Sequence, residues 1–132
     1  MSPSTSGLLV PGDGTCLTIN DINQDYRPDF IAGVNSGKFK VFLNQTQSKS
    51  MAINILDRSE GRNHIGAKVS VIFSDDSIQL HEISAGGGYL SQSAPVVFIG
   101  EGNSERKVEN IKIRWPDGFI KEFKVDEFRT QD

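Results

Sequence analysis

The sequence has few of the residues that build reactive or cross-linked sites in proteins. Cys16 is the only cysteine among 132 residues, so no disulfide can form within the chain, and we expect its thiol to be buried and inert. The two histidines, His64 and His81, are too few for a histidine-rich zinc site. Because a catalytic nucleophile needs a nearby base and a third group that orients the base, we expect no enzyme site here.

The chain also lacks long runs of apolar or basic residues. No apolar stretch approaches the roughly 20 residues that cross a bilayer, so we expect no membrane span. Fourteen basic residues are scattered among 17 acidic ones, and without a basic patch we expect no nucleic-acid partner. Residues 1–7 have neither the basic nor the apolar part of a signal peptide. If the protein is exported, we expect its targeting segment to lie outside these residues.

Short β-branched and aromatic runs are abundant, and they alternate with polar residues between Gly, Asn, Asp and Pro. This pattern predicts an all-β fold, an antiparallel β-sandwich or barrel-like domain preceded by a three-strand meander. The polar stretch 45–50 separates the two parts. The expected organisation is an irregular segment at 1–14, the meander at 15–46, a β domain at 51–125 and a tail at 126–132. Strands are predicted at 15–20, 30–34, 38–43, 51–56, 67–73, 77–84, 96–99, 108–115 and 119–125.

Turn residues predict the connections between these strands. Asn35-Ser36-Gly37 predicts a tight turn in the first hairpin, because Gly37 can adopt positive φ without steric cost and Asn35 tolerates it. The strongest hairpin signal is Pro116-Asp117-Gly118, and we expect Trp115 before it to pack at the edge of the core rather than to form an exposed platform. The alternation breaks at Glu82, which predicts a bulge.

The sequence Asp-Ile-Asn-Gln-Asp-Tyr-Arg-Pro-Asp at 21–29 has the composition of a cation-binding loop. Calcium takes about six to eight oxygen ligands at flexible geometry, and a loop that turns alternate residues inward supplies several of them. We therefore predict calcium as cofactor. The candidate metal ligands are the side chains of Asp21, Asn23, Asp25 and Asp29 and the backbone carbonyl of Arg27.

The loop departs from an EF-hand in two ways. Position twelve is Ala32 rather than a bidentate Glu, and position six is Tyr26 where the sharp turn usually has glycine. Tyr26 must either adopt positive φ or force a different turn. The alternative is an acidic loop closed by Asx turns, with solvated carboxylates and no metal.

Two parts of the chain also resemble known families. Residues 17–35 and 41–44 resemble an FG-GAP or VCBS repeat, the calcium-binding blade unit of integrin-like β-propellers, and the resemblance places its metal residues on the same five positions. Residues 51–125 resemble the ASPIC/UnbV domain, which follows such repeats in cartilage acidic protein and its bacterial relatives. The second resemblance is carried by three motifs, at 61–69, 84–93 and 113–118.

The resemblance implies a secreted, periplasmic or cell-surface protein, and extracellular calcium suits a weak loop site. We expect a non-enzymatic calcium-binding module that binds a protein or glycan partner. The alternative is a structural or oligomerisation domain without metal, in which exposed strand edges pair copies of the chain. Because one three-strand blade cannot bury both faces, we expect it to pack on the following domain or on another chain.

Overall fold

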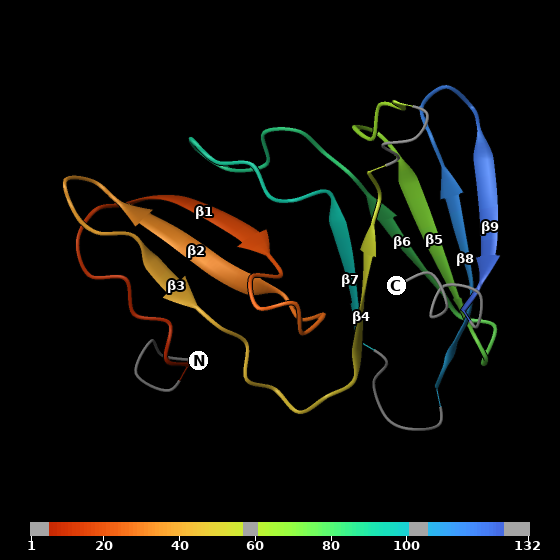
Figure 1. Ribbon diagram of the computed structural model, residues 1–132, viewed down its shortest axis with the longest axis horizontal. Coiled ribbons are helices and arrows are strands. Elements are labelled where there is room, and N and C mark those ends of the chain that lie inside the picture. The colour runs from red at the N-terminus through yellow and green to blue at the C-terminus, as the bar shows by residue number, and fades with distance from the viewer. Residues whose placement is uncertain (1–5, 57–60, 101–105, 126–132) are drawn as a thin grey trace. The chain divides into compact units, whose positions relative to one another are not determined.

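The computed structural model describes residues 6–56, 61–100 and 106–125, in which nine β strands form three antiparallel sheets without a helix (Figure 1). The predicted all-β, antiparallel fold class is confirmed. These ranges accordingly contain no helix of the length and apolarity that crossing a membrane requires. The strands are β1 (Gly14–Asn20), β2 (Asp29–Val34), β3 (Lys40–Phe42), β4 (Ser50–Asn54), β5 (Lys68–Phe73), β6 (Ile78–Glu82), β7 (Val96–Gly100), β8 (Val108–Arg114) and β9 (Ile120–Lys124).

The chain divides into two compact units. Unit 1 consists of residues 1–46 and 85–94, and unit 2 consists of 47–84 and 95–132. Residues 85–94, which we expected in the second domain, therefore group with the first unit. The expected tail at 126–132 lies outside the described residues.

Unit 1 is a meander in the order β1-β2-β3, extended by residues 85–94, which we call the edge segment (Figure 1). The edge segment bonds the edge of β1 that β2 leaves free. Ala94 N donates to the Ile19 carbonyl at 3.2 Å, and Ile19 N donates to Ser93 Oγ at 3.1 Å. Thr18 Oγ1 donates to the Gln92 carbonyl at 2.8 Å. A segment distant in sequence thus covers the first strand.

The turn between β2 and β3 differs from the prediction. Ser36, and neither Asn35 nor Gly37, adopts the positive φ, 54°. Gly37 has a steric role instead, because an added Cβ would lie 3.1 Å from Val34 Cγ1. Its N–H closes the turn on the Val34 carbonyl at 3.1 Å.

Unit 2 contains the hydrophobic core. The β4–β7 pair and the sheet β6-β5-β8-β9 each turn one face inward, as the alternation of buried residues along β7 and along β5 shows. A fully buried Val, Ile or Phe side chain contributes roughly 1.5–3 kcal/mol, so this cluster dominates the stability of the unit. Its members are Ile53, Ile55, Ala67, Val69, Val71, Phe73, Ile83, Val97, Ile99, Val108, Ile111, Ile113, Trp115 and Val125.

Strand β6 runs in regular register beside β5, and the bulge predicted at Glu82 is wrong. The register shift in this sheet lies between Ile72 and Phe73, where β5 pairs with β8. The alternation breaks at Glu82 because the apolar residues Ile78 and Leu80 lie on the outer face, 59% and 75% exposed.

The turn from β8 to β9 follows the prediction. Gly118 has φ 89°, and its N–H donates to the Trp115 carbonyl at 3.0 Å. The Trp115 side chain is only 5% exposed, and its ring centroid lies 5.6 Å from that of Phe119. The packing role predicted for Trp115 is confirmed.

Candidate functional site

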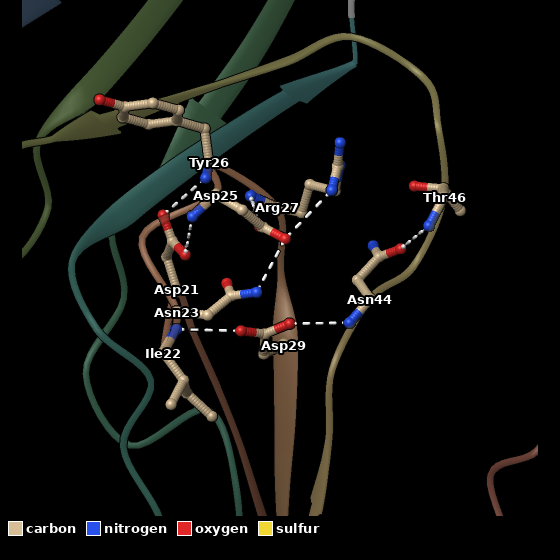
Figure 2. Close-up of polar contacts among 9 residues, drawn as sticks. All are labelled: Asp21, Ile22, Asn23, Asp25, Tyr26, Arg27, Asp29, Asn44 and Thr46. Atoms are coloured by element: carbon tan, nitrogen blue, oxygen red, sulfur yellow. Dashed lines mark hydrogen bonds and ion pairs between the residues drawn. The ribbon is translucent and has the colours of Figure 1, made fainter.

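The acidic loop joins β1 to β2, and its first carboxylate organises the turn (Figure 2). Asp21 Oδ1 accepts a hydrogen bond from Asp25 N at 3.0 Å, and Asp21 Oδ2 accepts one from Tyr26 N at 2.8 Å. Such side-chain-to-backbone bonds satisfy N–H groups that no strand can pair. Each carboxylate oxygen has two lone pairs, so Asp21 can still face a cation.

The backbone makes the sharp turn at position six of the loop, although Tyr26 occupies the position where glycine is usual. Tyr26 adopts φ 64° and Gln24 adopts φ 60°, so both lie in the left-handed region. This conformation is costly for a bulky side chain, and the hydrogen bond from Tyr26 N to Asp21 offsets part of the cost. Tyr26 therefore makes the turn at position six without glycine.

Asp25 is surrounded by donors from its own loop. Asn23 Nδ2 donates to Asp25 Oδ2 at 3.0 Å, and Arg27 reaches the same oxygen with its guanidinium at 3.1 Å. Arg27 N donates to Asp25 Oδ1 at 3.0 Å. Partial desolvation raises the pKa of Asp25, but the bonds from Asn23 and Arg27 and the Arg27 charge outweigh it and hold the pKa below its usual value.

Asp29, the first residue of β2, is fully buried. Its Oδ2 accepts from Ile22 N at 3.0 Å, and its Oδ1 accepts from Asn44 N at 2.8 Å (Figure 2). Asp29 therefore ties the start of the acidic loop to the chain that leaves β3. The role of Asn44 was missed, although β2–β3 pairing between Phe30 and Phe42 brings these residues to the same end of the sheet.

A hard cation requires several oxygen ligands directed at one point. All five candidate ligands offer oxygen, the donor that calcium prefers. Asp21, Asn23 and Asp25 are joined through direct bonds, whereas Asp29 uses both oxygens on backbone amides and Asp25 faces Arg27. In the three described ranges, no three Asp, Glu, His or Cys side chains form a group that could hold a metal. The donor chemistry fits calcium, and the carboxylates would have to turn toward the ion.

A second cluster brings two of the ASPIC/UnbV-like motifs together in unit 2. The guanidinium of Arg62 forms an ion pair with Asp117 and lies 3.9 Å from the centroid of the Phe119 ring. The loop 61–66 is thereby fastened to the β8–β9 turn, beside Trp115. Sequence reasoning missed this contact, since nothing in either motif shows that the two turns lie at the same end of the sheet.

An open pocket of about 580 Å³ lies in unit 1, beside β1 and the edge segment. Its lining includes Thr15, Cys16, Tyr89 and Ser93 and contains no carboxylate, histidine, lysine or arginine. Cys16 is half-buried rather than fully buried as expected.

Comparison with known proteins assigns the larger part of the chain to a family. A search of curated proteins finds no match. The model of the family "ASPIC and UnbV" matches residues 57–130, more than half of the 132-residue chain and the part that contains the Arg62–Asp117 cluster. The match does not reach the acidic loop. The chain belongs to the ASPIC and UnbV family.

Proposed function

We propose that the chain is a non-enzymatic, calcium-binding β module that binds a protein or glycan partner outside the cytoplasm. In this proposal residues 15–46 are an FG-GAP or VCBS-type repeat. The observation that carries it is the backbone of the acidic loop, where Tyr26 makes the left-handed turn at position six with φ 64°. The turn draws Asp21, Asn23 and Asp25 together, as the bonds among them show.

The residues that would hold the ion are Asp21, Asn23, Asp25, Asp29 and the carbonyl of Arg27. Calcium would supply positive charge that balances these carboxylates. Arg27 already faces Asp25, so the ion would compete with its guanidinium. We therefore expect a weak site, in the range of roughly 10⁻⁴–10⁻³ M that suits extracellular modules.

A second candidate is a structural or oligomerisation domain without metal. The observation that favours it is that the loop neutralises itself, since Arg27 pairs with Asp25 at 3.1 Å and Asp29 binds two backbone amides. In this case the loop is a fixed connection between β1 and β2.

Thermal unfolding in EDTA and in a calcium titration separates the two candidates. A ligand that binds only the folded chain raises the melting temperature by mass action, and about ten times Kd of calcium gives ~1.4 kcal/mol, or roughly 3–6 °C. Asp25→Ala should abolish the rise. Asp13→Ala, which removes a carboxylate of unit 1 outside the loop, should keep it. No rise up to ~10 mM calcium would contradict calcium binding and favour the structural domain.

A further inference from the structure

The sheet edges of the described residues are protected to different degrees. Natural proteins guard an exposed edge with charged residues, proline, bulges, short strands or a covering segment. In unit 1 the edge segment bonds β1 at Thr18 and Ile19, and β3 is only three residues long and begins with Lys40. In unit 2 the outer edge strand β9 has the sequence Ile-Lys-Glu-Phe-Lys. Strand β6, with the sequence Ile-Gln-Leu-His-Glu, is an edge of the four-stranded sheet without lysine, proline or bulge, and β4 and β7 are the edges of the two-stranded sheet.

The hydrogen bonds of β6 show which backbone groups face outward. Ser77 and Ile83 turn toward β5, because the Ser77 carbonyl accepts from Phe73 N at 3.0 Å and Ile83 N donates to the Ala67 carbonyl at 2.9 Å. Alternate residues of an antiparallel strand bond to opposite sides. Ile78, Leu80 and Glu82 therefore direct their N–H and C=O groups to the free edge.

The side chains of Ile78, Leu80 and Glu82 do not oppose the approach of another strand. Ile78 is 59% exposed and Leu80 is 75% exposed, and both lie on the outer face of the sheet. Glu82 already has a cation on its own sheet, since its Oε2 lies 3.7 Å from Lys68 Nζ. An edge whose outer face carries two apolar side chains and one paired carboxylate can accept another strand with little desolvation of charge.

We propose that β6 pairs with β6 of a second copy of this chain, antiparallel about a two-fold axis through Leu80, and joins two four-stranded sheets into one. Leu80 is the central residue of the strand, so this register uses all five residues. Leu80 then lies opposite Leu80 of the second copy, and Ile78 lies opposite Glu82. Three residues of each copy exchange both backbone bonds, about six bonds in all.

Charge favours the register centred on Leu80 over one centred on Glu82. Centred on Leu80, the pairing sets no like charges opposite each other, whereas centring on Glu82 would oppose two carboxylates, which is unfavourable. Next to the central Leu80 pair, Gln79 lies opposite His81 of the second copy, so these two polar residues face each other. The strand can therefore pair with itself without opposing like charges, with Ile78 opposite Glu82 in the two outer pairs.

The size of the contact sets its strength. A five-residue edge pair buries less than the roughly 1,600 Å² of a standard interface, so the dimer is weak and concentration-dependent. We expect sedimentation equilibrium of the whole chain to show a monomer–dimer equilibrium with Kd of about 10 μM–1 mM. The dimer does not require calcium, so EDTA should leave it unchanged.

Leu80→Lys should abolish the dimer, because two lysines would then lie opposite each other. Its high exposure makes this substitution tolerable for the fold, which circular dichroism would verify. Ile120→Lys is the matched control, since it adds the same charge to the exposed edge strand β9 and should leave dimerisation unchanged. A wild-type chain that stays monomeric up to ~2 mM, or a Leu80→Lys chain that still dimerises, would overturn the proposal.

Oxidative cross-linking tests the register. In a Cys16→Ser background, Leu80→Cys places two thiols opposite each other, where Cα atoms about 5.5 Å apart permit a disulfide. Ile78→Cys places the thiols four residues out of register and should cross-link at least tenfold more slowly. Equal rates of disulfide formation in the Leu80→Cys and Ile78→Cys chains would contradict pairing centred on Leu80. Dimers that form only when an extended peptide from another protein is added would contradict self-pairing.

Discussion

Asp29 accepts hydrogen bonds from two segments that are distant in the sequence. Its buried carboxylate fixes Ile22 at 3.0 Å and Asn44 at 2.8 Å, so it joins the acidic loop to the end of the meander. A buried carboxylate is costly unless its oxygens are bonded, and these amides supply that compensation. The position of Asp29 in the loop was predictable from spacing, but this role was not, because it depends on the pairing of β2 with β3.

Asp29→Ala should destabilise the chain by about 2–4 kcal/mol, because two backbone N–H groups lose their acceptor. Urea unfolding in EDTA measures this loss without any contribution from calcium. Asp13→Ala provides the comparison, with an expected change within about 0.5 kcal/mol for a surface substitution. An Asp29→Ala chain as stable as the Asp13→Ala chain would mean that the buried carboxylate is not needed to hold the loop.

At the scale of elements, the edge segment was the feature that sequence reasoning did not predict. Alternation and turn residues predicted all nine strands, because these signals are local. The grouping of residues 85–94 with unit 1 depends on bonds to Thr18 and Ile19, which lie 74 positions away from their partners. No periodic pattern reports a contact at that separation. The glycines at 86–88 could have suggested a close backbone approach.

Gly88 makes this approach possible, since an added Cβ would lie 3.4 Å from the Leu17 carbonyl oxygen and would overlap the Ser91 hydroxyl. Gly88→Ala should therefore cost about 1–3 kcal/mol through overpacking. Chemical denaturation measures the loss, and Ser91→Ala in the same chain should recover part of it. Gly100→Ala, where nothing lies within 4 Å of the added Cβ, is the control. Equal stability of the two glycine variants would contradict the close packing of the edge segment.

Over the whole molecule, burial is distributed unevenly. The fourteen residues of the core cluster all belong to unit 2. Among the described residues of unit 1, only Ala32 and Asp29 are buried. Several of its large apolar residues remain exposed, including Phe39 at 71% and Tyr89 at 75%. A three-strand sheet without a core has little hydrophobic stabilisation to offset the conformational entropy lost on folding.

We therefore expect a fragment of residues 1–46 to be unfolded on its own. It would keep the acidic loop and all three strands of the meander but lose the edge segment, which bonds Ile19 through Ala94 N and Ser93 Oγ. The measurement is the amide proton dispersion of the fragment compared with that of the whole chain. Because metal binding can drive folding, the spectrum should be recorded in EDTA and again in ~10 mM calcium. Dispersed amide signals in EDTA would contradict the dependence of unit 1 on residues 85–94, whereas dispersion in calcium alone would show that the ion stabilises the meander.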